Sequence, residues 1–197
     1  MRLYPALLIV SFLFCLDLTA QEEAPAKENF KIGVMSGYGF QDEPLLGLDY
    51  YYRVIFMGAQ GYWTFFDKKS YTFDLRLEGQ YNLTTSIYDS VYYTDKQKGY
   101  EYGMQVGVAF RRHFQTEALN LYLLLSVGPY YISDSLYRQA AGFVFSDNIA
   151  AGVNIKLVKS LYFDVSLGFR HVSDTGIKKP DGGINTVTVW GGVVVVL

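Results

Sequence analysis

Cysteine is almost absent from this sequence. Of its 197 residues only Cys15 carries a thiol, and it lies within the first twenty, which we expect to be removed as a signal peptide. A mature chain without thiols has no disulfide framework and no cysteine-based metal site. Histidine is scarce as well, because His113 and His171 are the only two and lack the spacing of metal ligands. The sequence therefore predicts no metal and no cofactor.

Basic residues are in no surplus, and two motifs of soluble enzymes are missing. The chain has 17 Lys and Arg residues and 19 Asp and Glu residues, which gives a formal net charge of -2 at pH 7. Nucleic acid is not expected as a partner, since phosphate binding needs clustered Lys and Arg. The chain has no Gly-x-Ser-x-Gly elbow, which excludes a soluble α/β-hydrolase, and no Gly-rich phosphate loop that leads into a helix.

Long apolar runs are lacking too, whereas aromatic side chains are abundant. No segment after the first twenty residues has the unbroken apolar stretch of a transmembrane helix. The 18 Tyr, 14 Phe and 2 Trp make up 17% of the chain, which suits the aromatic girdles of a membrane barrel. A membrane protein without spanning helices must be a closed barrel, because lipid satisfies no backbone hydrogen bonds.

The first twenty residues have the layout of a secretory signal. Arg2 supplies a positive start, residues 7–14 an apolar core and residues 18–20 a cleavage site. The apolar core is too short to span a bilayer, which argues against a retained anchor. Lipidation is rejected because Phe14 precedes Cys15, where a lipoprotein signal needs a small residue. The chain is thus predicted to consist of a signal peptide (1–20), a polar periplasmic leader (21–29) and one outer-membrane barrel (30–197).

Strict alternation of apolar and polar residues predicts the strands. It is clearest over residues 71–83, where only Gly79 interrupts the apolar row. The length suits a membrane crossing. Within 50–66 the register stays ambiguous, so either face could point outward. We expect strands at 30–40, 50–66, 71–83, 100–111, 119–127, 148–157, 161–173 and 184–197, which make an all-β, eight-stranded, antiparallel, up-and-down transmembrane β-barrel.

The lengths of the connections predict the orientation of the barrel. Short links at 67–69, 115–117 and 158–160 alternate with longer ones at 42–47, 84–98, 133–140 and 174–183. Short periplasmic turns and longer outer loops are the rule for bacterial barrels. The link between the last two strands is therefore expected outside the cell, at the outer leaflet of a Gram-negative outer membrane. His113 continues an inward row and is interpreted as a structural residue of the lumen.

Two polar residues end the outward row of the seventh strand. The row is apolar from Leu161 to Phe169 and continues with His171 and Ser173. Polar groups that face a membrane need an explanation. Either the strand has left the hydrocarbon by His171, which makes both residues ordinary interfacial ones, or they carry a function.

The amino-acid sequence of this segment resembles a known family motif. Residues 170–177 read RHVSDTGI and residues 180–185 read PDGGIN. They are similar to the C-terminal pattern of the lipid A 3-O-deacylase (PagL) family of acyloxyacyl hydrolases, which is approximately His-x-Ser-Asn-x-Gly followed by Pro-Asn-x-Gly-Ile-Glu. The resemblance implies a cofactor-independent carboxylic-ester hydrolase that removes an ester-linked acyl chain from lipid A, the lipid part of lipopolysaccharide, on the outside wall of the barrel.

The same resemblance assigns the candidate catalytic residues. Ser173 would be the nucleophile and His171 the base that takes its proton. Asn185 would occupy the third position of the triad, across the hairpin from His171, where the family has Glu. Asp174 stands where the family has the Asn of the oxyanion hole. An amide cannot offset the charge of an imidazolium, and a carboxylate has no hydrogen to donate to an oxyanion.

These departures leave other interpretations open. Asp174 and Asp181 are alternatives to Asn185 as the acid of the triad. The alternatives to an active enzyme are a catalytically degenerate relative and a non-enzymatic small barrel with a structural or adhesive role at the cell surface. A His171–Ser173 hydrogen bond on the lipid-facing wall would favour the enzyme, and divergent side chains the barrel alone. The sequence carries no signal for an oligomeric state.

Overall fold

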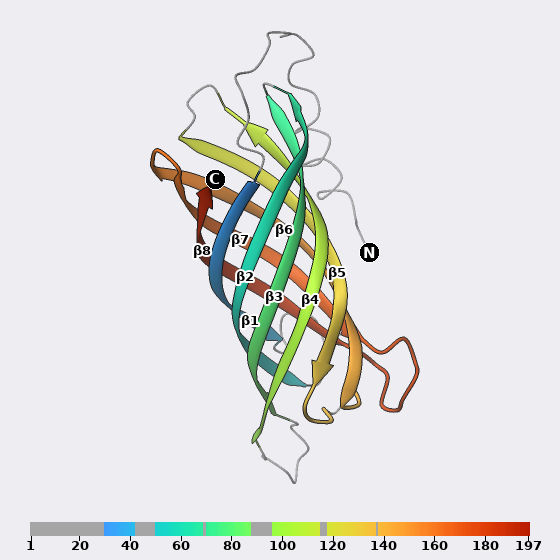
Figure 1. Ribbon diagram of the computed structural model, residues 1–197. Coiled ribbons are helices and arrows are strands. Elements are labelled where there is room, and N and C mark those ends of the chain that lie inside the picture. The colour runs from blue at the N-terminus through green and yellow to red at the C-terminus, as the bar shows by residue number, and fades with distance from the viewer. Residues whose placement is uncertain (1–29, 42–49, 69, 88–95, 115–117, 137) are drawn as a thin grey trace, which may run out of the picture.

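In the computed structural model the chain forms one closed barrel of eight antiparallel strands, each paired with its neighbours in the sequence, with β1 closing onto β8 (Figure 1). This confirms the predicted fold class. The structure describes residues 30–41, 50–68, 70–87, 96–114, 118–136 and 138–197. The strands are β1 (Phe30–Gln41), β2 (Tyr51–Lys68), β3 (Tyr71–Ile87), β4 (Lys96–His113), β5 (Leu119–Ile132), β6 (Gly142–Val158), β7 (Leu161–Ser173) and β8 (Ile184–Val196).

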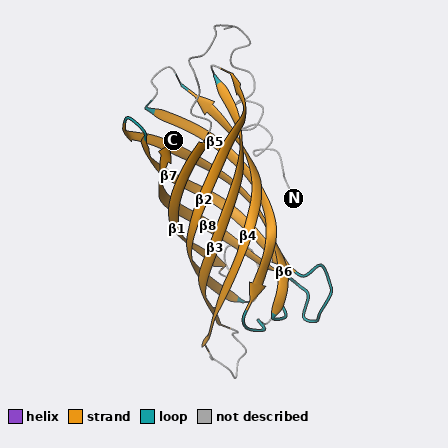
Figure 2. Cartoon of the chain, viewed as in Figure 1, coloured by secondary structure: helices purple, strands orange, loops and turns teal. Residues whose placement is uncertain are grey.

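Every described element is a strand or a connection between strands, as Figure 2 shows. Among the described residues no helix is long and apolar enough to cross a membrane. The expected signal peptide (1–20), the leader (21–29) and the turn at 115–117 lie outside the described residues.

Several strands are longer than the alternation predicted. β6 begins at Gly142 rather than at residue 148, because its first residues pair with the end of β5, from Pro129 to Ile132. The link expected at 84–98 shrinks to 88–95, since the polar ends of β3 and β4 continue their pairing as far as Ile87 and Lys96. Polar side chains on both faces suit strand segments that extend beyond the hydrocarbon into water. The extension of β6 brings Asp147 into the sheet.

A bulge explains the ambiguous register of β2. The pairing with β3 shifts between Thr64 and Phe66, so Phe65 and Phe66 are both exposed. Such a bulge places two residues opposite one on the partner strand and breaks the alternation. The inward row of β2 also contains large apolar residues, such as Tyr52 and Phe56, which are buried. Both faces of β2 are therefore apolar, and sequence alternation could not separate them.

The two ends of the barrel differ in their connections. At one end, called here the loop end, lie the longer links, including 133–141 and 174–183. At the other, the turn end, the links are short, as at 159–160, and the C-terminus lies there, at the upper end of Figure 1. Short and long links thus alternate around the barrel as the sequence predicted.

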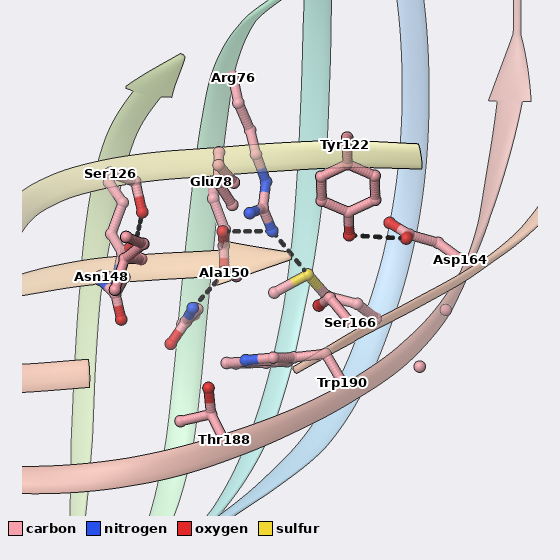
Figure 3. A pocket seen from close by; sticks show the side chains of 17 residues that line it. Arg76, Glu78, Tyr122, Ser126, Asn148, Ala150, Asp164, Ser166, Thr188 and Trp190 are labelled. Carbon is pink, nitrogen blue, oxygen red and sulfur yellow. Dashed lines mark hydrogen bonds and ion pairs between the residues drawn. The ribbon is translucent and has the colours of Figure 1, made fainter. Parts of the chain in front are cut away.

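Side chains fill the interior with hydrogen bonds and ion pairs (Figure 3). Arg76 pairs with Glu78 at 2.6 Å, and the Tyr122 hydroxyl donates to Asp164 at 2.8 Å. A cavity of about 30 Å³, roughly the room for one water molecule, remains among the residues of Figure 3. His113 lies nearer the turn end, where its Nδ1 lies 2.8 Å from Asn120 Oδ1, as expected of a structural residue in the lumen.

Near the loop end a mostly apolar cluster closes the interior. It surrounds the guanidinium of Arg170, which lies between the rings of Phe56 and Tyr130 at 5.5 and 5.1 Å. Arg170 Nη2 donates to Glu101 Oε2 at 2.8 Å, and both side chains are buried. The buried apolar members are Tyr50, Tyr52, Val54, Phe56, Tyr130, Ile132, Leu136, Val144, Val172 and Ile184. The end of β7 therefore rests on a packed interior.

The ion pair in this cluster gives a stability prediction. Glu101→Ala leaves the charge of Arg170 buried without its partner, which should lower the free energy of unfolding by about 3–5 kcal/mol. The measurement is urea unfolding in detergent micelles, followed by tryptophan fluorescence. Lys179→Ala is the control, because Lys179 is 83% exposed in its pair with Asp181 and its loss should change nothing measurable. Equal unfolding curves for the two variants would contradict the role given to the buried pair.

Candidate functional site

The pairing of three strands places three polar residues side by side on the outer wall. His171 of β7 lies opposite Asp147 of β6 on one side and opposite Asn185 of β8 on the other. All three belong to the outward rows, and His171 and Asn185 are half-buried whereas Asp147 is exposed. Side chains directly opposite each other on one face have Cβ atoms about 4.5–5.5 Å apart. We call Asp147, His171 and Asn185 the polar rung.

The imidazole of His171 is fixed by its partner across the hairpin. His171 Nδ1 lies 2.7 Å from Asn185 Oδ1. A carbonyl oxygen only accepts, so Nδ1 must donate and must carry the proton. The lone pair of the neutral ring is then on Nε2, which is the tautomer that a general base requires. The predicted meeting of these two residues is thus present in the structure.

Glycine at position 183 allows the ring to lie where it does. A Cβ atom at Gly183 would lie 2.7 Å from His171 Cε1 and 3.3 Å from Nε2, so no other residue fits without moving the ring. Gly183 also has a φ of 66°, a conformation that favours glycine. The imidazole therefore lies against the backbone of Gly183, just before β8, on the loop-end side of Asn185. Ser173 lies on the same side, two residues beyond His171.

Ser173 shares the outer face with His171 but makes no hydrogen bond to it. Residues i and i+2 of a strand point to the same side, and both side chains are half-buried. Among the described residues, no side-chain partner of the Ser173 hydroxyl is found. Its neighbour across the β6–β7 pair is Phe145, which packs edge-on against Phe143 at 5.1 Å. The hydroxyl thus lies beside an aromatic side chain, on the same face as the imidazole of His171.

Asp174 is bound inside the turn that follows β7. Its Oδ1 accepts the N–H of Gly176 at 3.1 Å, its Oδ2 accepts the N–H of Lys178 at 2.9 Å, and the residue is 2% exposed. The carboxylate therefore shapes the loop and offers no donor to an oxyanion. Asp181 is engaged by Lys179 at 2.6 Å, which lowers the pKa of its carboxyl, and it does not belong to the polar rung.

Asp147 is the residue that sequence reasoning missed. It lies opposite His171 through the β6–β7 ladder and is the carboxylate of the polar rung. The signal was in the outward row of β6, where Asp147 precedes Ile149 and Ala151 by even spacing. A polar residue in a lipid-facing row is the same kind of signal that singled out His171. It passed unnoticed because the strand was expected to begin at residue 148.

The chemistry available on this wall is that of a base beside a hydroxyl. Within the described part of the chain, no group of three His, Cys, Asp or Glu side chains could hold a metal ion. The interior cavity is lined from inside the barrel and contains none of the rung residues. A substrate of the polar rung must therefore approach from the outside of the barrel, where membrane lipids lie.

Comparison with known proteins adds an independent finding. The family model described as "Lipid A 3-O-deacylase (PagL)" matches residues 57–193, which include the polar rung and Ser173. The crystal structure of the outer membrane enzyme PagL superimposes with a TM-score of 0.55 at 13% identity, covering 82% of this chain and 97% of that one. Neisserial surface protein A superimposes with a TM-score of 0.55 at 11% identity, covering 85% and 97%. No curated protein sequence matches the chain.

Proposed function

The chain belongs to the lipid A 3-O-deacylase (PagL) family, and we propose from that premise that it is an outer-membrane esterase that removes an ester-linked acyl chain from lipid A. The observation that carries the proposal is the hydrogen bond between His171 Nδ1 and Asn185 Oδ1 on the outer wall. It leaves the lone pair of the imidazole on Nε2, on the outer wall of the barrel, where membrane lipids lie.

The barrel and its family support a location in the bacterial outer membrane. In our proposal residues 1–20 direct export and are removed, residues 21–29 remain in the periplasm, and the loop end faces the outside. The polar rung then lies at the outer leaflet, which contains lipopolysaccharide. Two rungs nearer the turn end the same wall is apolar, with Leu167 opposite Ala151 and Val189. Acyl chains would lie there.

The first step forms a covalent intermediate. Ser173 Oγ attacks the carbonyl carbon of the ester while His171 Nε2 takes the hydroxyl proton. The tetrahedral intermediate collapses, the bond between the carbonyl carbon and the sugar oxygen breaks, and the imidazolium returns the proton to that oxygen. The product is a free sugar hydroxyl and an acyl group on Ser173.

The second step regenerates the enzyme. His171 removes a proton from water, and the hydroxide attacks the acyl carbonyl. The bond to Ser173 Oγ breaks, the imidazolium protonates that oxygen, and a fatty acid leaves. Both steps need the same Nε2 base, so the fixed tautomer of His171 serves each of them.

Asp147 supplies the negative charge that Asn185 lacks. The imidazole becomes positively charged in both steps, and an amide offers only a dipole to that cation. The carboxylate of Asp147 lies opposite His171 on the other strand. The two side chains form no ion pair in the structure, and in our proposal the carboxylate acts on the imidazolium across an interface where water is partly excluded and charges interact more strongly than in water. Orientation and charge neutralisation are thus divided between Asn185 and Asp147.

Mass spectrometry of lipid A tests the activity itself. Lipid A from cells that express the parent chain should lose the mass of one ester-linked acyl chain, and Ser173→Ala and His171→Ala should abolish this loss. Ser36→Ala, at an outward serine of β1 far from the polar rung, should behave as the parent. Heat-dependent gel mobility should show every variant folded, because these side chains support no core. An unchanged loss of mass in either of the first two variants would refute the assigned roles.

A second set of variants tests whether Asn185 orients the imidazole while Asp147 neutralises its charge. Asp147→Asn should lower turnover about tenfold to a hundredfold, less than the ~10⁴ cost of an acid-to-amide change at a hydrogen-bonded triad position. Asn185→Glu should raise turnover and should restore the Asp147→Asn variant, because a carboxylate then lies beside the imidazole again. The measurement is kcat on purified lipid A in mixed micelles. If Asp174→Asn or Asp181→Asn lowers turnover while Asp147→Asn does not, the carboxylate is misassigned.

Two observations favour a second candidate function, a non-enzymatic surface barrel. Ser173 makes no hydrogen bond to His171, and the third position holds an amide. The superposition with Neisserial surface protein A shows that the same fold occurs in a protein named for its place at the cell surface. An unaltered lipid A profile in cells with a folded, abundant parent chain would favour this second candidate.

A further inference from the structure

The backbone N–H of Asn185 is bound by a side chain far away in the sequence and not by the neighbouring strand β1. The last pair between β1 and β8 joins Phe40 and Val187, so Asn185 lies beyond the end of that ladder. Its N–H instead donates to the hydroxyl of Tyr50 at 3.0 Å, although the two residues are 135 apart in the sequence. Tyr50 immediately precedes β2 and is 4% exposed. Burial raises the pKa of this hydroxyl, so it stays neutral and available as an acceptor.

A second residue holds Tyr50 and the hairpin together. The guanidinium of Arg138, in the β5–β6 link, lies over the Tyr50 ring at 5.5 Å. Arg138 Nη2 also donates to the carbonyl of Gly182 at 2.9 Å. Gly182 precedes the glycine on which the His171 ring rests. Two further contacts join the same link to the hairpin, the N–H of Ala140 to the carbonyl of Pro180 at 2.9 Å and a β-bridge between Gln139 and Asp181.

We propose that Tyr50 and Arg138 form a brace that positions Asn185 and Gly183 and thereby fixes the orientation and tautomer of His171. Tyr50 is thus a positioning residue. Its effect on catalysis depends on the proposed esterase function. It contacts neither Ser173 nor the substrate face, since its side chain belongs to the buried cluster at the loop end.

A continuous chain of contacts joins Tyr50 to the imidazole of His171. Asn185 is bound through its backbone to Tyr50 and through its side chain to His171 Nδ1. A shift of the Asn185 backbone therefore moves the acceptor that selects the tautomer. The brace joins Tyr50, which precedes β2, and Arg138, in the β5–β6 link, to the start of β8, beyond the last pair between β1 and β8 among the described residues. Such support is needed because a ring that is free to rotate presents Nε2 only part of the time.

The test compares two tyrosine variants in the same cluster. Tyr50→Phe removes only the hydroxyl that accepts from Asn185. Tyr130→Phe is the matched control, because Tyr130 is equally buried there and its hydroxyl accepts from Gln105 at 2.9 Å, away from the polar rung. Arg138→Met is a second variant on the partly exposed side of the brace and does not threaten folding. Gel mobility before and after heating checks the fold of each.

The first readout is nitrogen-15 NMR of the imidazoles in detergent micelles. The chain has only two histidines, so His171 is assigned by its loss in His171→Gln, and His113 serves as an internal reference. In the parent and in Tyr130→Phe, His171 should be protonated on Nδ1. In Tyr50→Phe and Arg138→Met it should become a mixture of tautomers, while His113 stays unchanged. A His171 spectrum that is the same in all four proteins would overturn the brace.

The second readout is turnover. Losing one hydrogen bond of ordinary strength should lower kcat about threefold to tenfold in Tyr50→Phe, with the KM for lipid A unchanged. A kcat equal to that of Tyr130→Phe would overturn the catalytic role of the brace. If the parent itself cleaves no lipid A, the proposed function fails, and the tautomer alone then decides whether the brace exists.

Discussion

Backbone hydrogen bonds that lipid cannot satisfy are the constraint on which this structure depends. In hydrocarbon every N–H and C=O must find a partner within the protein, and a closed antiparallel barrel provides one for each. Closure fixes the alternation of side chains, because successive residues must point in and out. The inward row is then free to hold charge, as in the Arg170–Glu101 pair. The outward row must be apolar except where a polar group has a reason to be there.

The polar rung follows from this constraint. The pairing that satisfies the backbone also brings residues from three strands to one height on the wall, and no loop is needed to assemble them. A site built on strands is held more precisely than one on loops. The long links contribute in another way: they pack on one another at the loop end and hold the start of β8. Scaffold and site are thus parts of the same hydrogen-bonded network.

The sequence predicted what depends on local alternation and missed what depends on distant pairing. The outward placement of His171, Ser173 and Asn185 follows from even spacing within one hairpin, and the structure has the His171–Asn185 contact. The register of β2 was not predictable, because a bulge and an apolar inner face both conceal the alternation. The pairing of Asp147 with His171 depends on a register shift between β6 and β7 at Lys156 and Val158, and no feature of the sequence indicates this shift. The contact of Tyr50 with Asn185 arises only when the barrel closes.

The central claim is that Ser173 is an activated nucleophile on the lipid-facing wall. A fluorophosphonate with a long alkyl chain, added to the protein in phospholipid vesicles, tests this claim most directly, because it reacts with an activated serine and reaches it only through the membrane. We predict one phosphonyl adduct on Ser173, found by peptide mass spectrometry, and none in the His171→Ala variant. An unmodified Ser173 in the folded parent chain, or equal labelling without His171, would contradict it.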